Sequence, residues 1–268
     1  MTRHALAVDI GGTFTDIVLR SAAGRVWTDK VLTTHDDLLE GFFRGVDAVL
    51  TRARVAPAEV DDVVAHATTV VTNALIERKG ARTALLATAG FTDVLRIRNE
   101  HRYDMYDPQI EYPDPLVPPE LTRGVNERVR GDGSLVRPVD PEEIAAIARE
   151  LRALGVQSVA VCLLNSYRNP ANERAAGAAL RRAAPDLYVS LSSEIAPQIR
   201  EYPRTSTTVI NAYTQPVAQP YLQRMAGELA ARGFPHAPVV MLSSGGVVSA
   251  ITACRAPVRM IESGPAAA

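Results

Sequence analysis

The chain has 268 residues, of which 47% are hydrophobic, and its formal net charge is -1 at pH 7. A net charge this close to zero excludes the strong positive field that recruits nucleic acid or an anionic membrane surface, so neither is expected as a partner. No apolar stretch reaches the roughly 18 residues of a membrane span, and the first residues lead directly into a predicted strand rather than a signal peptide. The composition therefore predicts a cytoplasmic protein with one large or two modest domains.

The first predicted element along the chain is a β-hairpin. Apolar residues at 5–8 and 17–19 flank a bend formed by Gly11 and Gly12, which is typical of two antiparallel strands joined by a tight turn. Two adjacent residues without a Cβ atom let the backbone approach a bulky anion and direct successive N–H groups toward it. The bend is therefore predicted to bind phosphate, and an ordinary Gly-Gly hairpin is the alternative.

Polar side chains around the bend support the phosphate interpretation. Thr13 and Thr15 add hydroxyl donors, and Asp9 ends the first strand. A carboxylate in that position can hold a hydrated Mg²⁺ ion that otherwise has only phosphate oxygens and water as ligands. No Gly-Lys-Ser/Thr follows the glycines and no helix opens directly after them, so the turn is neither a Walker loop nor a Rossmann fingerprint.

Strands and helices alternate along the rest of the chain. Periodicity predicts strands at 26–33, 63–67, 83–88, 159–164, 187–191 and 239–242, and helices at 36–54, 69–79, 140–154, from 169 onward and at 205–232. The strands at 63–67 and 83–88, with the helix between them, are predicted to form a βαβ unit. The pattern predicts an α/β fold with a mixed sheet and helices on both faces.

The polar residues Thr68, Thr69 and Asn73 lie where a predicted buried strand meets the start of a helix. Hydroxyl groups and free N–H groups come together at such a junction. Capping of the helix by Thr68 or Thr69 and capping combined with ligand contact are both open. The neighbouring His66 is interpreted as a packing residue rather than a metal ligand.

Residues 98–121 carry five prolines and three tyrosines, and no regular structure is predicted there. A loop of this length inside a compact domain is uncommon unless it has a function. Arg98 and Asp104 are among the charged residues at its entry, so the loop is a candidate substrate lid or subunit contact. A solvated excursion without a function is the alternative. The two cysteines, Cys162 and Cys254, have no metal or redox spacing and are expected to be reduced, buried or near-surface thiols.

The strand, Asp-x-Gly-Gly-Thr turn and second strand resemble the first phosphate loop of the actin-like ATPase superfamily. Within that superfamily, Val-Asp-Ile-Gly-Gly-Thr-Phe-Thr-Asp at residues 8–16 most resembles the opening of the hydantoinase A / 5-oxoprolinase family. Further segments that resemble the family lie at 66–78, 88–95, 127–129, 243–246 and 262–267. The resemblance covers nearly all of the chain, but its motifs do not identify the substrate.

The resemblance implies an actin-like (ribonuclease H-like) fold. Residues 1–200 would be the hydantoinase/oxoprolinase N-terminal domain with the first phosphate loop, and residues 201–268 the start of the hydantoinase A domain. The family's second Asp-x-Gly-Gly-Thr loop is expected shortly after residues 263–265, whereas the sequence stops at Ala268. We therefore expect a fold that is incomplete relative to the full two-domain architecture, as either a truncated fragment or a split subunit that needs a partner.

The resemblance also implies ATP and Mg²⁺ as cofactors. In such an enzyme, phosphorylation of a cyclic amide, such as a hydantoin or 5-oxoproline, at its carbonyl oxygen prepares that carbonyl for attack by water. Since phosphoryl transfer depends on positioning and charge neutralisation, Asp9 and Asp16 are the candidate catalytic residues and Asp9 the candidate metal ligand. The candidate phosphate-binding residues are Gly11, Gly12, Thr13 and Thr15. Thr68, Thr69, Asn73, Arg98 and Asp104 are candidates for the substrate site or its lid.

The implied partner is a hydantoinase B-type subunit or domain in a homo- or hetero-oligomer, with a small cyclic amide or ketone as substrate. One alternative is the ATP-binding subunit of an acetone- or acetophenone-type carboxylase. Another is a non-catalytic half-domain that needs its missing portion or a partner. The isolated chain is expected to be inactive. A sugar kinase is less favoured, because those enzymes lack the segment at 68–78 in this form.

Overall fold

The computed structural model describes residues 3–100 and 102–263, without the side chains of residues 64–68. The chain forms two compact units. Unit 1 contains residues 1–79 and 217–268, and unit 2 contains residues 80–216. Unit 2 is therefore an insertion between two segments of unit 1, and the second boundary falls within helix α7 (Glu201–Ala231).

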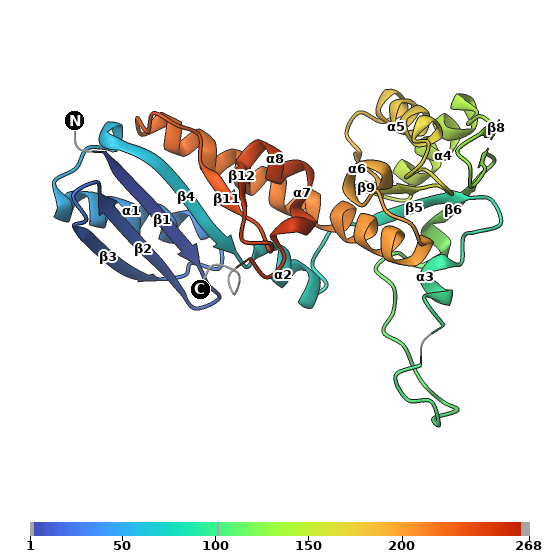
Figure 1. The fold of residues 1–268 in the computed structure, drawn as a ribbon, viewed down its shortest axis with the longest axis horizontal. Helices are drawn as coiled ribbons and strands as arrows, with labels where there is room; N and C mark the ends of the chain where they lie inside the picture. The colour runs from blue at the N-terminus through green and yellow to red at the C-terminus, as the bar shows by residue number, and fades with distance from the viewer. Residues whose placement is uncertain (1–2, 101, 264–268) are drawn as a thin grey trace. The chain divides into compact units, whose positions relative to one another are not determined.

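Unit 1 is built on a six-stranded mixed sheet with the strand order β12-β11-β4-β1-β2-β3 (Figure 1). The first three strands form an antiparallel meander, while β4 runs parallel to β1 and β11 runs parallel to β4. The strands are β1 (His4–Ile10), β2 (Phe14–Ser21), β3 (Val26–Leu32), β4 (Val60–Thr68), β11 (Val239–Met241) and β12 (Val247–Ser249). The helices are α1 (Leu38–Ala53), α2 (Val70–Ile76), α8 (Ala250–Arg255) and the second half of α7, with short 3₁₀ turns at Pro57–Glu59 and Pro257–Met260.

Helix α1 packs its apolar stripe on the sheet of unit 1. Phe42 and Val46 are fully buried, and Gly45 allows close approach, because a Cβ atom there would lie 2.2 Å from Cδ1 of Ile17. Leu222 on the second half of α7 is buried in the same core. Asp37 caps α1 by accepting a hydrogen bond from the Leu39 N–H at 3.1 Å, as expected for an acidic residue before an amphipathic helix.

Unit 2 is built on a four-stranded sheet with the order β10-β9-β5-β6, in which all pairs are parallel. A separate two-stranded hairpin joins β7 and β8. The strands are β5 (Thr83–Thr88), β6 (Thr122–Val125), β7 (Arg128–Val129), β8 (Leu135–Arg137), β9 (Ser158–Cys162) and β10 (Tyr188–Leu191). The helices are α3 (Val94–Ile97), α4 (Pro141–Ala153), α5 (Ala171–Ala183), α6 (Ser192–Ile195) and the first half of α7, with a 3₁₀ turn at Pro119–Leu121.

Helices cover both faces of the sheet in unit 2. On β10, the Ser190 hydroxyl accepts a hydrogen bond from Asn211 of α7 at 2.9 Å, while the next residue, Leu191, lies against Gly177 of α5. Successive side chains of a strand point to opposite faces, so α5 and α7 lie on opposite sides. Every residue of β5 and β9 is accordingly buried. The predicted α/β class with helices on both faces is thus confirmed in this unit.

The predicted βαβ unit is wrong. Strand β4 belongs to the six-stranded sheet of unit 1, whereas β5 belongs to the four-stranded sheet of unit 2. Hydrophobic runs show that each strand is buried, but they do not show which sheet it joins. The short strands β6 and β12 and helix α8 were also not predicted. The proposed division of the sequence near residue 200 stays a prediction.

Candidate functional site

Three parallel strands of unit 1 end at one edge of its sheet. Strand β1 leads into Gly11, the neighbouring β4 leads into Thr69, and β11, next to β4, leads into Ser243. Because neighbouring parallel strands place their carboxyl ends at the same edge, the structure brings these three turns together (Figure 1). Ligands of open α/β sheets characteristically bind at this kind of edge.

The Gly11–Thr13 turn is held from one side and open on the other. The Gly11 N–H donates to the Phe14 carbonyl at 2.9 Å, which closes the turn. Thr33, just after β3, donates its N–H to the Thr13 carbonyl at 3.0 Å and its hydroxyl to the Gly11 carbonyl at 2.9 Å. Neither the Gly12 nor the Thr13 N–H donates to an acceptor within the described part of the chain. A Cβ atom on Gly12 would meet nothing within 4 Å, so an anion has both donors and space there.

Two acidic side chains lie on one face of the hairpin. Asp9 of β1 and Asp16 of β2 are directly paired across the strands, and paired residues share a face. The Lys30 ammonium of β3 donates to both oxygens of Asp16, at 2.8 and 3.1 Å. Among the described residues, no group of three or more metal-binding side chains occurs. A divalent ion at Asp9 would therefore take most of its ligands from phosphate and water.

Thr15 lies on the opposite face of the same hairpin. It is fully buried, and its hydroxyl is 3.1 Å from that of Thr33. This pairing connects β2 to the residue that holds the turn. Sequence reasoning had not singled out Thr33 or Lys30, although pairing of the predicted strand at 26–33 with the hairpin would have placed residue 30 beside residue 16.

The polar residues after β4 lie at the same edge. Thr69 is the N-terminal cap residue of α2, but its side chain makes no capping hydrogen bond. The Asn73 N–H donates to the Thr69 carbonyl at 2.6 Å, and both side chains are half-buried. The side chains of Thr68 and His66 lie outside the described residues.

A second glycine turn, at 243–246, connects β11 to β12 and is exposed. The Gly245 N–H donates to the Leu242 carbonyl at 2.9 Å, and the Ser243 hydroxyl donates to the Arg259 carbonyl at 2.7 Å. This turn completes the sheet edge, which we call the strand-end site.

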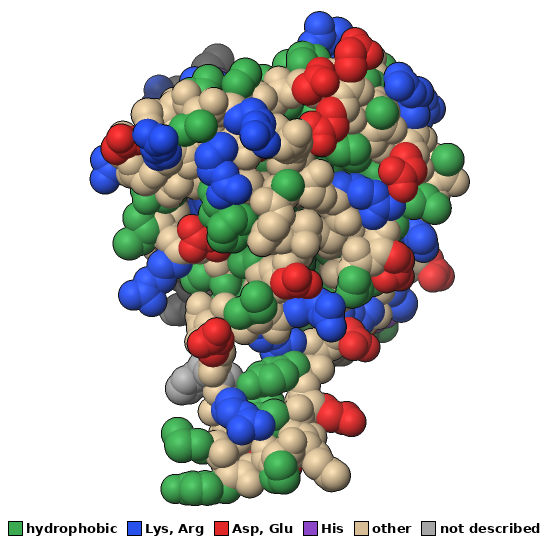
Figure 2. All heavy atoms as spheres, turned by 90° about the vertical axis from the view of Figure 1, so that its right-hand side faces the viewer, with side chains coloured by type: hydrophobic (Ala, Val, Ile, Leu, Met, Phe, Trp, Pro, Cys, Tyr) green, Lys and Arg blue, Asp and Glu red, His purple; other side chains and the backbone are tan. Residues whose placement is uncertain are grey.

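Arg98 and Asp104 belong to unit 2, in the long excursion at 98–113. The Arg98 guanidinium lies 4.4 Å from the centre of the Tyr112 ring and donates to the Pro113 carbonyl at 2.5 Å. Asp104 accepts from the Tyr106 N–H at 3.0 Å. These contacts order the excursion internally, while Met105 and Tyr106 are 72% and 93% exposed. Hydrophobic side chains gather at the end of the excursion (Figure 2).

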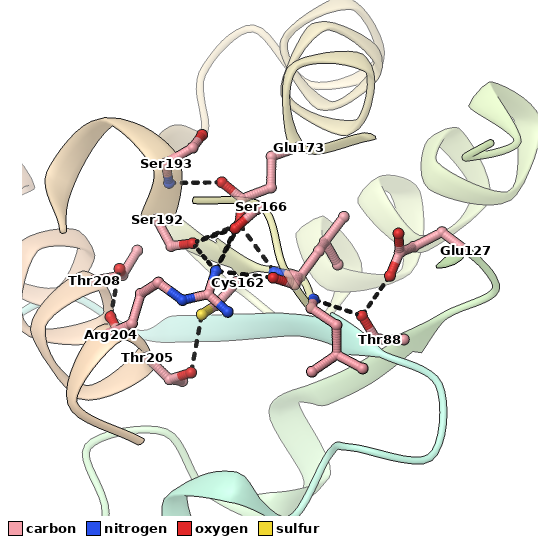
Figure 3. A network of polar contacts seen from close by, with 12 residues as sticks. Thr88, Glu127, Cys162, Ser166, Glu173, Ser192, Ser193, Arg204, Thr205 and Thr208 are labelled. Atoms are coloured by element: carbon pink, nitrogen blue, oxygen red, sulfur yellow. Dashed lines mark hydrogen bonds and ion pairs between the residues drawn. The ribbon is translucent and has the colours of Figure 1, made fainter. Parts of the chain in front are cut away.

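A buried polar cluster, which sequence reasoning missed, lies in unit 2 (Figure 3). Arg204 of α7 donates through Nη1 to the Leu163 carbonyl and the Ser192 hydroxyl, each at 2.8 Å, and to Ser166. Glu173 of α5, whose Oε1 is 3.9 Å from the same nitrogen, accepts from the Ser192 hydroxyl at 2.5 Å. Arg204 and Glu173 are 1% and 0% exposed. We call this group the Arg204 cluster.

Both cysteines are buried, as predicted. The Thr205 hydroxyl donates to Sγ of Cys162 at 2.9 Å. Burial raises the pKa of the Cys162 thiol above its ordinary value, and burial raises the pKa of Cys254 as well. A thiol with a raised pKa is a poor nucleophile at neutral pH, so these two residues have a packing role.

Models of one known protein family match almost the whole chain. Residues 5–184 match the hydantoinase/oxoprolinase N-terminal region, and residues 204–268 match the hydantoinase/oxoprolinase model. The chain belongs to the hydantoinase/oxoprolinase family. No helix in the described part of this family member has both the length and the apolar character needed to cross a membrane.

Curated relatives in the family carry out different reactions. The chain is 37% identical to the caprolactamase subunit alpha of Pseudomonas jessenii, over 99% of this chain and 39% of that protein. It is 32% identical to the acetophenone carboxylase gamma subunit of Aromatoleum aromaticum, over 91% of this chain and 35% of that protein. It is 31% identical to the 5-oxoprolinase of Saccharomyces cerevisiae, over 91% of this chain and 22% of that protein. The chain thus spans well under half the length of these relatives.

Solved structures of family members share the fold. The crystal structure of the ATP-dependent caprolactamase from Pseudomonas jessenii matches with a TM-score of 0.88, over 98% of this chain and 39% of that one. The nucleotide-free structure of acetone carboxylase matches with a TM-score of 0.87 at 28% identity, over 99% of this chain and 39% of that one. The predicted actin-like, mixed α/β fold class is therefore confirmed.

Proposed function

We propose that this chain supplies the first phosphate loop of an ATP-dependent enzyme that activates the carbonyl of a cyclic amide for hydrolysis. The observation that carries the proposal is the strand-end site, where the Gly12 and Thr13 N–H groups, which follow Asp9 in the turn, have no acceptor within the described part of the chain. The relative named caprolactamase, at 37% identity over 99% of the chain, favours an amide as substrate. Because the chain spans 39% of that relative, the activity of the whole protein is part of the proposal.

The residues present fit a magnesium nucleotide. Oxygen ligands suit Mg²⁺, which keeps several waters and binds through one or two carboxylates together with phosphate oxygens. Asp9, half-buried at the end of β1, would hold the ion or its water. The N–H groups of Gly12 and Thr13, with the Thr13 hydroxyl, would bind phosphate oxygens, and Gly11 would keep the turn tight. Bound MgATP supplies a phosphoryl group that turns the amide oxygen into a leaving group.

The remaining candidates would have supporting roles. Asp16, oriented by Lys30, would position a water or neutralise charge on the same face as Asp9. Thr15 would act through Thr33, because its hydroxyl is already engaged there. Thr68, Thr69 and Asn73 follow the neighbouring strand and would contact the nucleotide or the substrate.

We further propose a hydantoinase B-type partner and an oligomeric enzyme, because the relatives named above include alpha and gamma subunits. The excursion that carries Arg98 and Asp104 is a candidate contact for that partner or a substrate lid. The carboxylase alternative is supported by the TM-score of 0.87 with acetone carboxylase. The half-domain alternative would require a partner for nucleotide binding.

The test is calorimetric titration of MgATP into this chain, alone and with its partner subunit. We expect Asp9→Asn to weaken MgATP binding by about tenfold or more, and to change binding of ATP without magnesium much less. Asp62→Asn is the matched control, because Asp62 is an exposed residue of β4 paired with Ala5, toward the other end of β1. Equal affinity of the wild type and Asp9→Asn for MgATP would contradict the proposal.

Binding only in the presence of the partner would favour the half-domain alternative. The substrate would then be sought by measuring ADP release with lactams, hydantoins, 5-oxoproline and ketones. Release with a ketone plus bicarbonate, and not with any amide, would favour the carboxylase alternative.

A further inference from the structure

The strand order of unit 2 creates a crevice at the carboxyl edge of its sheet. From β5 the chain continues to β6 on one side, and later passes to β9 on the other side of β5 and then to β10. The connections that leave β5 and β9 therefore run in opposite directions. In open parallel sheets, ligands bind outside the carboxyl ends of two strands that are arranged in this way.

A cavity of about 630 Å³ lies at this position. Its wall includes Thr88, the last residue of β5, and Cys162, the last residue of β9. Figure 3 shows Cys162 beside Arg204 and Thr205 of α7, which also line the cavity. Its volume falls within the range of pockets for small molecules.

The cavity wall has an apolar part. Phe91, Val94 and Ile97 follow β5 and line one region. Phe91 and Ile97 are 46% and 56% exposed, so apolar surface faces solvent there. A ligand with an apolar body would cover these side chains and gain hydrophobic stabilisation.

The polar part of the wall favours a negative charge. Three arginines line the cavity, Arg98, Arg200 and Arg204, against the two carboxylates of Asp93 and Glu201. Helix α7 begins here, at Glu201, and continues for 31 residues. The first N–H groups of a helix have no partner within the helix and attract anions. Glu173 offsets the charge of Arg204, so the remaining charged side chains of the wall balance one another. The N-terminus of α7, directly after Arg200, is the part of the wall that favours an anion.

Arg204 provides an independent observation. Its side chain is 1% exposed and lines the cavity, and its Nε has no hydrogen-bond partner within the described part of the chain. Buried donors are paired in the great majority of cases. A ligand oxygen in the cavity would lie beside this guanidinium, which still has one donor without an acceptor among the described residues.

We propose that this cavity binds a small organic carboxylate. The apolar body of the ligand lies against Phe91, Val94 and Ile97, and its carboxylate lies at the start of α7 near Arg200 and Arg204. The site is made only of residues in unit 2, so it does not depend on the strand-end site or on the proposed function. It adds a second small-molecule site to the chain.

The test uses the full chain, with hexanoate as the probe and the neutral hexanamide as its match. Calorimetry gives the affinities, and amide chemical shifts in NMR spectra locate the site. We expect saturable hexanoate binding, about tenfold tighter than that of hexanamide. The largest shifts are expected at Cys162, Thr205 and the residues after β5.

The decisive variant is Arg200→Gly. Arg200 has a φ of +75°, which glycine adopts without strain, so the variant should fold. It should weaken hexanoate binding by about tenfold and leave hexanamide binding unchanged. Arg54→Gly, at a φ of +58° in unit 1, is the matched control and should change the affinity for neither ligand. Phe91→Ala should weaken the binding of both ligands.

Three results would overturn the proposal: no saturable binding of hexanoate by the wild type, shifts scattered away from the cavity, or full hexanoate affinity in Arg200→Gly. MgATP titration of the same samples reports separately on the strand-end site. The failure of one proposal is therefore distinguishable from the failure of the other.

Discussion

The Gly11–Thr13 turn of unit 1 and the Arg204 cluster of unit 2 use polar groups in opposite ways. In the turn, two backbone N–H groups have no acceptor in the described part of the chain, and there is open space beside Gly12. In the cluster, hydroxyl groups, a carboxylate and a guanidinium bond mainly to one another in the core. The comparison indicates that donors left open are available for a ligand, whereas a network in which most polar groups are paired holds elements together.

The Arg204 cluster connects three elements of unit 2. Glu173 lies on α5, Arg204 on α7, and Ser192 at the start of α6. Glu173 also accepts from the Leu163 N–H after β9, at 2.9 Å. A buried, hydrogen-bonded ion pair adds little net stability compared with an apolar core, but loss of one partner leaves a buried charge uncompensated.

The largest expected effect follows from breaking the cluster. Glu173→Leu should lower the free energy of unfolding by roughly 3–5 kcal/mol, because the Arg204 charge is left buried without a counterion. The double variant Glu173→Leu/Arg204→Met should recover part of that loss. Urea unfolding followed by circular dichroism measures both.

The matched control for that prediction is Asp16→Asn, which removes one side of the exposed pair with Lys30. Exposed pairs typically contribute less than about 1 kcal/mol. If Glu173→Leu costs no more than Asp16→Asn, the cluster does not hold unit 2 together.

The two glycines of the turn allow a second test, in which the expected change in stability is smaller. A Cβ atom on Gly11 would lie 3.0 Å from the Phe14 carbonyl oxygen, which is backbone and yields little, whereas Gly12 has open space. Gly11→Ala should therefore reduce the free energy of unfolding by about 1 kcal/mol. Gly12→Ala should change it by less than about 0.5 kcal/mol.

For MgATP affinity we expect the opposite order: Gly12→Ala, which hardly affects stability, should have the larger effect. The methyl group of Gly12→Ala occupies the space that an anion would use, so this variant should weaken MgATP binding while it remains folded. Calorimetry on the same samples decides this. Unchanged affinity in Gly12→Ala would mean that the open space beside residue 12 is not used by phosphate.

The smallest effect is expected at Asp37 in unit 1. Its carboxylate is paired, unlike the N–H groups of the turn, but it is more exposed than the Arg204 cluster. A hydrogen bond from the Arg224 guanidinium is the main cause of its lowered pKa, and the Nη2 to Oδ2 distance is 2.6 Å. Because the folded pKa lies below the unfolded value of about 3.9, the resulting stability is fully present above that value. It is lost as the pH falls through the folded pKa.

Asp37→Asn keeps the helix cap but removes the charge. Its urea midpoint should therefore lie slightly below that of the wild type at pH 7, and the difference should shrink as the pH falls below about 3.9. A difference that is the same at pH 7 and at acid pH would show that the charge of Asp37 does not contribute to stability.

The local features of the chain could be predicted from the sequence. Strand β5 was predicted with the bounds the structure has, and helix α4 begins at Pro141 with Asp140 as its cap. The Gly11–Gly12 bend between two strands was predicted as well. Hydrophobic periodicity, capping and the steric freedom of glycine act within a few residues, so a short window of sequence is enough to read them.

The sequence by itself therefore determined most of the elements, the glycine turn between the first two strands and the family. Only the tertiary structure separated β4 and β5 into different sheets, buried Thr15 against Thr33 and paired Lys30 with Asp16. It alone brought Arg204 to Glu173, which is 31 positions away, through the packing of α5 and α7 on one sheet. The physical reason is that these contacts depend on which strands pair and which faces meet, and those choices are made by the whole core rather than by neighbouring residues.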